Sequence, residues 1–256
     1  MRTKVFFASD FHLGVDARLT SVEREKQIVD WMTSIQDEVS ELYLVGDIFD
    51  YWFEYKSVVP RGFSRFLAKL SEYRDAQIPV HFFTGNHDMW MFDYFEIEYG
   101  IPVYRAPIVR EIQGKRLFIG HGDGLGPGDL GYKIVKSIFS NRLCQWLYAR
   151  IHPNLGIRIM RKFSHTSRDV GGDNGSFVGV DKEMLVQYAT ALEINEHHDY
   201  YIFGHRHLPL DVSIGSSGAT YFGLGDWTEY QSYGVLEDGL FSLQYYNTEP
   251  RTKIVK

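Results

Sequence analysis

Residues 42–50 have the sequence LYLVGDIFD, which combines a buried strand with a turn rich in carboxylates. Residues 42–45 are apolar, and a short apolar run bounded by turn residues is typical of a strand covered on both faces. Gly46 allows a sharp turn, and Asp47 and Asp50 follow it. The segment therefore predicts a strand of an α/β fold that carries carboxylates at its carboxyl end.

Four other segments repeat this arrangement. Apolar runs occupy residues 5–8, 80–83, 117–119 and 200–203. The clusters that follow them are Asp10-Phe11-His12, Gly85-Asn86-His87-Asp88, Gly120-His121-Gly122-Asp123 and Gly204-His205-Arg206-His207. Because the carboxyl ends of strands in an α/β sheet face one crevice, we expect all five clusters to lie close together.

The spacing of the strands divides the chain into two parts. Helical periodicity in residues 21–35 and 63–73 separates the first strands, and this alternation predicts an α/β layered fold. Residues 124–196 interrupt this alternation of strands and helices, and the first half of this segment has an amphipathic helical pattern. We therefore predict a core of residues 1–123 and 197–256 and an inserted helical cap of residues 124–196.

The residue types of the five clusters point to a metal centre. Carboxylates, imidazoles and an amide oxygen, without a thiolate, suit Mn²⁺, Fe or Zn²⁺. One Asp-x-His or Gly-Asp alone is a weak signal, since turns favour the same residues, but five clusters in order are not. Two ions about 3.5–4 Å apart activate water and clamp the oxygens of a phosphoryl group. The sequence therefore predicts a two-metal phosphoesterase.

The order Asp-x-His, Gly-Asp-x-x-Asp, Gly-Asn-His-Asp, Gly-His and Gly-His-x-His resembles the calcineurin-like metallophosphoesterase superfamily. The resemblance spans most of the chain and implies a layered β-sandwich flanked by helices. It also implies two divalent ions, with Mn²⁺ expected first and Fe or Zn²⁺ as alternatives. One ion would be held by Asp10, His12, Asp47 and His207. The other would be held by Asp47, Asn86, His121 and His205, so that Asp47 bridges the two.

The same resemblance implies a role for residues beside the ions. His87 would stabilise the transition state or protonate the leaving oxygen, and Asp50 or Asp88 would orient it. Asn86 would help to take up the developing negative charge.

Three features together resemble a narrower family, the UDP-2,3-diacylglucosamine diphosphatases of lipid A synthesis. They are residues 46–52 (GDIFDYW), the His-Gly-Asp cluster, and a basic helical insertion before Gly-His-Arg-His. The resemblance implies a nucleotide-linked glycolipid substrate, cleaved at its pyrophosphate to UMP and 2,3-diacylglucosamine 1-phosphate. It also implies a peripheral location on the cytoplasmic face of the inner membrane. The residues that would bind substrate are Asp129, Tyr132, Arg161 and Ser164.

This chain departs from that narrower family at one position. Its well-known members have arginine where this chain has His87, which restores the pattern of the wider superfamily. Arginine is a fixed cation, whereas histidine can titrate and donate a proton. A phosphodiesterase or phosphomonoesterase that acts on a different, soluble substrate therefore remains the alternative. A non-catalytic binding scaffold is disfavoured because all seven expected ligands are present.

The composition limits the classes of binding partner and the cellular location that we expect. The net charge of −6 gives no general basic field, so we expect no nucleic-acid partner, and the sequence implies no protein partner. Only Cys144 is present, so no internal disulfide forms. No apolar stretch is long enough for a signal peptide or a membrane span, which favours a cytoplasmic protein.

The cap has a charge pattern of its own. Residues 133–168 contain eight cations and no Asp or Glu, mixed with large apolar side chains. This composition is typical of an interfacial helix on an anionic membrane. The alternative is an apolar face that packs on the core with its cations in solvent. The resemblance favours contact with lipid.

Overall fold

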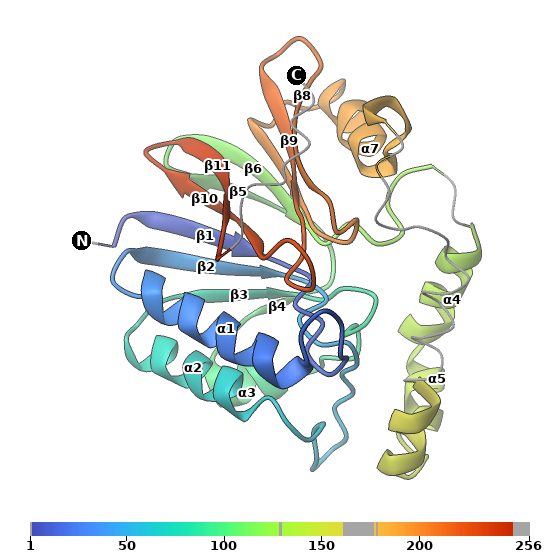
Figure 1. Ribbon diagram of the computed structural model, residues 1–256. Coiled ribbons are helices and arrows are strands. Elements are labelled where there is room, and N and C mark those ends of the chain that lie inside the picture. Colours follow the sequence, from blue (N-terminus) through green and yellow to red (C-terminus); the bar gives the residue numbers. More distant parts are fainter. Residues whose placement is uncertain (1, 128–129, 161–176, 178, 248–256) are drawn as a thin grey trace.

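The computed structural model describes residues 2–127, 130–160, 177 and 179–247, without the side chains of residues 130–132. Two β-sheets pack face to face, and helices cover the outer face of each (Figure 1). The predicted α/β fold, a layered β-sandwich flanked by helices, is confirmed.

The first sheet has six strands in the order β11-β10-β1-β2-β3-β4. Its strands are β1 (Lys4–Ala8), β2 (Val39–Val45), β3 (Val80–Phe83), β4 (Val103–Tyr104), β10 (Ser232–Glu237) and β11 (Leu240–Tyr245). Strands β1 to β4 are parallel, whereas β10 is antiparallel to both of its neighbours. The parallel strands therefore bring their carboxyl ends to one edge.

The second sheet has five strands in the order β5-β6-β7-β9-β8. They are β5 (Ile108–Ile112), β6 (Lys115–Gly120), β7 (Tyr200–Phe203), β8 (Pro209–Ile214) and β9 (Ala219–Leu224). Strand β7 is parallel to β6 and to β9, although 79 residues separate the end of β6 from the start of β7. The segment that contains the predicted cap thus leaves and re-enters the sheet between neighbouring strands.

Apolar side chains fill the space between these layers. Phe7, Tyr43, Ile202 and Phe222 are among those that meet between the two sheets. Helices α1 (Ser21–Ile35), α2 (Ser64–Asp75) and α3 (Tyr94–Tyr99) cover the first sheet, and α7 (Met184–Glu193) covers the second. Helix α1 begins at a capping box formed by Thr20 and Glu23 and buries Ile28, Trp31, Met32 and Ile35, one stripe at helical spacing.

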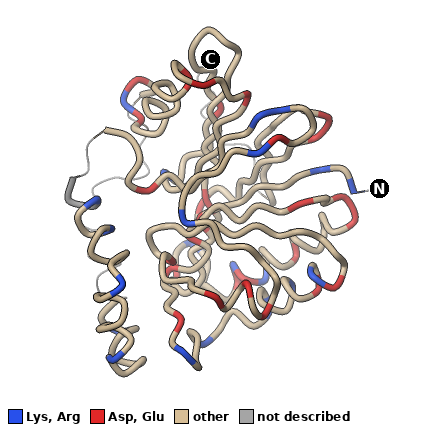
Figure 2. Tube along the Cα trace, turned by 180° about the vertical axis from the view of Figure 1, so that it is seen from behind, with Lys and Arg blue, Asp and Glu red and all other residues tan. Residues whose placement is uncertain are grey.

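Helices α4 (Leu130–Ser140) and α5 (Arg142–Tyr148), with helical residues 153–160, stand beside the sandwich (Figure 1). They contact the core through an aromatic cluster in which Trp90 donates a 2.8 Å hydrogen bond to the carbonyl of Phe139. The hydroxyls of Tyr51 and Tyr148 lie 2.9 Å apart in the same cluster. Basic residues, and no acidic ones, mark this helical column (Figure 2).

Helix α7 and the 3-10 turn before it (Val180–Lys182) fall within the predicted cap of residues 124–196. Leu185, Val186 and Ala189 of α7 are buried against the second sheet. This part of the range therefore packs on the sandwich. The division into a core of residues 1–123 and 197–256 and a cap stays a prediction.

Candidate metal centre

The five predicted clusters follow β1, β2, β3, β6 and β7, and side chains from all five meet at the carboxyl ends of these strands. The backbone there is held in an unusual conformation. Asp10, His12, Asp47, His205 and His207 all have a positive φ, between 45° and 65°. Left-handed backbone costs a non-glycine residue about 1–2 kcal/mol. Such strain persists where the surrounding structure enforces it, as it does at functional sites.

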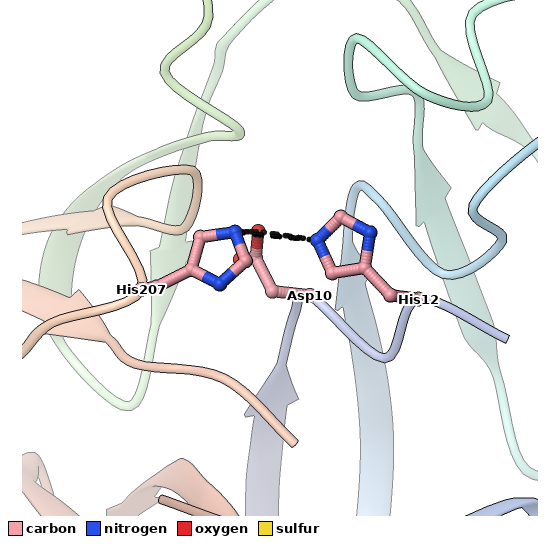
Figure 3. Close-up of side chains that lie close together, drawn as sticks. All are labelled: Asp10, His12 and His207. Carbon is pink, nitrogen blue, oxygen red and sulfur yellow. Dashed lines mark hydrogen bonds and ion pairs between the residues drawn. The ribbon is translucent and has the colours of Figure 1, made fainter. Parts of the chain in front are cut away.

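Asp10, His12 and His207 form the first group (Figure 3). The Nε2 atoms of His12 and His207 lie 3.2 Å apart, and their rings are stacked with centroids 4.9 Å apart. Asp10 Oδ1 lies 3.3 Å from His207 Nε2 and 3.7 Å from His12 Nε2. Three ligand atoms therefore converge on one point between β1 and the loop after β7.

Asp47, His121 and His205 form a second group. His121 Nε2 lies 3.3 Å from Asp47 Oδ2, and the rings of His121 and His205 have centroids 5.2 Å apart. The same Asp47 oxygen lies 3.9 Å from His12 Nε2 in the first group. A single carboxylate thus faces both groups, which is the arrangement that a bridging ligand requires.

Several polar atoms at this point are buried without a hydrogen-bond partner. They include Asp10 Oδ1, Asn86 Oδ1 and His121 Nε2. An unsatisfied buried polar atom costs about 1–3 kcal/mol, and a cation bound at each group would together satisfy all three. Carboxylate, imidazole and amide donors are also the set that suits divalent transition metals. The residues present therefore fit divalent cations.

The pKa shifts agree with this interpretation. Burial lowers the pKa of the His121 imidazole, but the charges of Asp47 and Asp10 outweigh burial and raise it to about 10. Burial opposes ionisation of Asp47, yet the neighbouring histidines, His121 and His87 first, hold its pKa well below the usual value. Protein without metal thus binds a proton at His121, the position at which a cation would replace it.

His87 forms a third group with His12 and Asp47, each of which belongs to one of the first two. Its Nδ1 atom is 3.1 Å from the carbonyl oxygen of Asp50 and 3.4 Å from the carboxylate of Asp50. Burial, the largest cause, lowers the pKa of His87 to about 4. Since a carbonyl only accepts, Nδ1 carries the hydrogen of the neutral ring, which directs Nε2 away from Asp50.

The buried carboxylate of Asp88 contacts the backbone of two loops at the centre. Its carboxylate accepts hydrogen bonds from the backbone of Gly85, Ile48 and Phe49. It therefore holds the backbones of the loops that carry Asp47 and Asn86. The backbone carbonyl oxygen of Asp50 lies within hydrogen-bond distance of His87 Nδ1 and orients that ring.

Two supporting residues were missed in the sequence. The buried guanidinium of Arg24 donates to the carbonyls of Phe11, His12 and Val15 and so fixes the loop after β1. Nothing in the sequence distinguishes this arginine from any other on an amphipathic helix. Asp226 accepts a 3.0 Å hydrogen bond from His207 Nδ1, and here a signal existed. Gly225-Asp226 follows an apolar strand, as Gly46-Asp47 does.

The residues predicted to bind substrate are Asp129, Tyr132, Arg161 and Ser164. Asp129, Arg161 and Ser164 lie outside the described residues, and so does the side chain of Tyr132.

Comparison with known proteins places this geometry in context. The family model described as calcineurin-like phosphoesterase matches residues 3–209. A UDP-2,3-diacylglucosamine hydrolase from Porphyromonas gingivalis is 37% identical, and the match covers 92% of this chain and 94% of that one. A protein of the same name from Shewanella sp. (strain MR-4) is 27% identical over 94% of this chain and 96% of its own. The solved structure of Yfce, a phosphoesterase from E. coli, covers 95% of this chain and 93% of its own at 17% identity, with a TM-score of 0.49.

Proposed function

Because this chain belongs to the calcineurin-like phosphoesterase family and is a metal-dependent hydrolase, we propose that it cleaves the pyrophosphate of UDP-2,3-diacylglucosamine. The products are UMP and 2,3-diacylglucosamine 1-phosphate, an intermediate in lipid A synthesis. The observation that carries this substrate is the relative at 37% identity, which matches nearly the full length of both chains. The shared carboxylate of Asp47 supports the hydrolytic chemistry.

The family works with divalent metal ions, and seven residues of this chain would hold them. Asp10, His12 and His207 face one position, and Asn86, His121 and His205 face the other, with Asp47 between them. When bound, such ions activate water and neutralise the phosphoryl oxygens. The family resemblance favours Mn²⁺, and Fe and Zn²⁺ are the alternatives because they accept the same oxygen and imidazole donors.

The remaining groups act on the phosphate itself. His87 presents Nε2 to the centre because its other nitrogen donates to the carbonyl of Asp50. It can thus contact a phosphoryl or leaving oxygen, and a proton taken up at Nε2 would be passed to that oxygen. The amide of Asn86 would donate to the oxygen that gains negative charge.

A cavity beside the centre supports a substrate with an anionic head group. The cavity has a volume of about 390 Å³ and lies between the loops that carry the expected metal ligands and the helices α4 and α5. Gly85 and Asp123, in the loops after β3 and β6, form one wall of the cavity. The side chains of Arg105, Lys136 and Arg142 contribute positive charge to its lining. A volume of this size is typical of sites for small organic ligands.

The surface of α4 and α5 supports contact with lipid. Ile134, Ile138, Leu143, Trp146 and Leu147 are all about half exposed or more. Basic side chains flank them, and the tube view shows only basic charge along these helices (Figure 2). Exposed apolar side chains among cations fit a peripheral site on an anionic membrane surface, at the cytoplasmic face of the inner membrane. Across the part of the chain that the structure describes, no helix has the length and apolar character to span a bilayer.

Direct hydrolysis tests the proposal. Purified protein with Mn²⁺ should release UMP from UDP-2,3-diacylglucosamine much faster than from UDP-N-acetylglucosamine, which lacks the acyl chains. Bis(p-nitrophenyl) phosphate measures the general phosphodiesterase activity in the same preparation. Equal turnover of acylated and unacylated nucleotides would refute the lipid substrate and leave the hydrolase in place.

His87 favours one second candidate, a phosphodiesterase or phosphomonoesterase with a soluble substrate. A residue that can deliver a proton assists a poor leaving group, whereas cleavage of a nucleotide anhydride needs less assistance. Efficient hydrolysis of simple alkyl phosphates would support this candidate.

A further inference from the structure

Asp226 lies behind His207, on the turn between β9 and β10. Its side chain is buried, with 3% of the residue exposed. One oxygen accepts hydrogen bonds from His207 Nδ1, at 3.0 Å, and from the hydroxyl of Thr228. The other accepts from the backbone N–H groups of Glu229 and Tyr230, each at 3.0 Å. Four donors therefore hold this carboxylate in one orientation.

This contact determines which nitrogen of His207 faces the metal centre. A carboxylate accepts hydrogen bonds and cannot donate them, so Nδ1 of His207 carries the hydrogen. The lone pair is then on Nε2, which lies 3.3 Å from Asp10 Oδ1 and 3.2 Å from His12 Nε2. Asp226 thus fixes both the tautomer and the direction of the ring.

The same turn also holds Asp10. The backbone N–H of Trp227 donates a 3.1 Å hydrogen bond to the carbonyl oxygen of Asp10. The indole of Trp227 is fully buried and packs against Phe11 and Trp31. Residues 226 and 227 therefore position two members of the Asp10–His12–His207 group from one rigid turn.

His121, one of the two histidines in the other group, has a weaker support. Nδ1 of His121 lies 2.8 Å from the carbonyl oxygen of Val45, which is a neutral acceptor. A charged carboxylate behind an imidazole raises its basicity as a ligand more than a carbonyl does, and loss of such a partner typically lowers metal affinity 10- to 100-fold. The two groups therefore depend on different supports.

From this geometry we infer that Asp226 is a positioning residue for the Asp10–His12–His207 group alone. Its loss would weaken the ion at this group and leave the ion at the Asp47–His121–His205 group in place. The inference rests on the proposed metal centre, but it is independent of which phosphate ester is the substrate.

Equilibrium binding of Mn²⁺ to purified protein tests it, with elemental analysis at each free Mn²⁺ concentration. The variants are Asp226→Ala and Asp226→Asn. Asp199→Asn is the matched control, because Asp199 likewise accepts hydrogen bonds from a side chain, Lys115, and from the backbone of Arg116. It precedes β7, whereas His205 follows that strand, so the control lies at the opposite end of the sheet.

Wild-type protein and Asp199→Asn should bind about two ions per chain. Asp226→Ala should keep one ion at wild-type affinity and bind the second about 10- to 100-fold more weakly. Asp226→Asn should lie between them, since an amide oxygen still accepts from His207 but carries no charge. Excess Mn²⁺ should restore turnover of bis(p-nitrophenyl) phosphate by both variants.

Two results would overturn the inference. Unchanged binding of both ions by Asp226→Ala would show that His207 needs no support, and equal weakening of both would indicate a general structural role. If Asp226→Ala fails to fold, Thr228→Val removes one donor to Asp226 and should produce a smaller, equally selective loss. If only the proposed substrate is wrong, the wild-type protein should bind both ions and leave UDP-2,3-diacylglucosamine uncleaved. Wild-type protein that binds no Mn²⁺ would refute the metal centre and this inference together.

Discussion

The carboxylate of Asp88 accepts a 2.8 Å hydrogen bond from the backbone N–H of Ile48, although the two residues are 40 positions apart. Its second oxygen accepts a 2.7 Å bond from Gly85. There is no room for a side chain at Gly85, because a Cβ atom would lie 2.2 Å from Asp47 Oδ1. The loops that carry Asp47 and Asn86 are therefore joined by one buried acid.

Replacement of Asp88 by Ala should lower both stability and turnover. The variant leaves backbone N–H groups of Gly85 and Ile48 buried without partners, at a cost of about 1–3 kcal/mol each. Asp88→Asn keeps one accepting oxygen and should lose less. Urea unfolding measures the stability, and turnover at saturating Mn²⁺ measures the displacement of the loops. Wild-type values for Asp88→Ala would contradict this account of the loops.

Glu54 should be a second buried carboxylate on which stability depends. One of its oxygens accepts from Trp52 Nε1, and the other accepts from three backbone N–H groups at the start of α3. Glu54→Ala should lower the free energy of unfolding by about 2–4 kcal/mol, and Glu54→Gln by less. Glu111→Gln, at an exposed acid on β5, serves as the control and should change it by less than about 0.5 kcal/mol.

Stability in acid should depend on Glu193 at the end of α7. Burial raises the pKa of this carboxyl, but hydrogen bonds from His197, Ser217, the backbone of His198 and Tyr201 outweigh burial and lower it to about 2. A depressed pKa means that its contribution is complete above pH 4.5 and is lost as the pH falls towards 2. Because Glu193 lies near the surface, where solvent screens charges, its contribution to the free energy of unfolding should be about 2 kcal/mol.

Urea unfolding between pH 6 and pH 2.5, with Glu193→Gln as the comparison, measures this contribution. The wild-type protein should lose stability more steeply than the variant below pH 4.5, the ordinary value for this carboxyl. Parallel curves for the two proteins would exclude Glu193 as a source of the acid sensitivity.

Vesicle binding should depend on the apolar face of α5. Leu143 and Trp146 are 64% and 53% exposed, and Arg150 lies over the ring of Trp146. Combined replacement of both apolar residues by Ser should reduce sedimentation with vesicles that contain anionic lipid. Each buried apolar side chain contributes about 1.5–3 kcal/mol, so the loss should be at least 10-fold. Ile97→Ser, at an exposed position on α3, should bind as the wild type does.

The strands and the converging clusters were predictable because both are local signals. An apolar run followed by Gly-Asp or Gly-His marks a strand and its end within ten residues, as at Asp47 and His121. The meeting of the clusters then follows from the general rule that parallel strands bring their carboxyl ends to the same edge of a sheet. These residues therefore meet as expected.

The supports of the site were not predictable in this way. Arg24 donates to backbone carbonyl groups of a loop. Because every residue has a backbone carbonyl, the sequence does not indicate which of them an arginine contacts. Asp226 contacts His207 only because β9 lies next to β7, a neighbour relation set by the packing of the whole sheet. The placement of α7 on the second sheet likewise depends on apolar contacts between distant segments.

The metal content of Asp47→Ala, measured beside that of the wild type, tests the central claim most directly. Elemental analysis after dialysis against Mn²⁺ should find about two ions in each wild-type chain. The variant should bind fewer ions and lose almost all turnover, because the carboxylate that faces both groups is gone. Full metal content and full turnover in Asp47→Ala would contradict a shared two-metal centre.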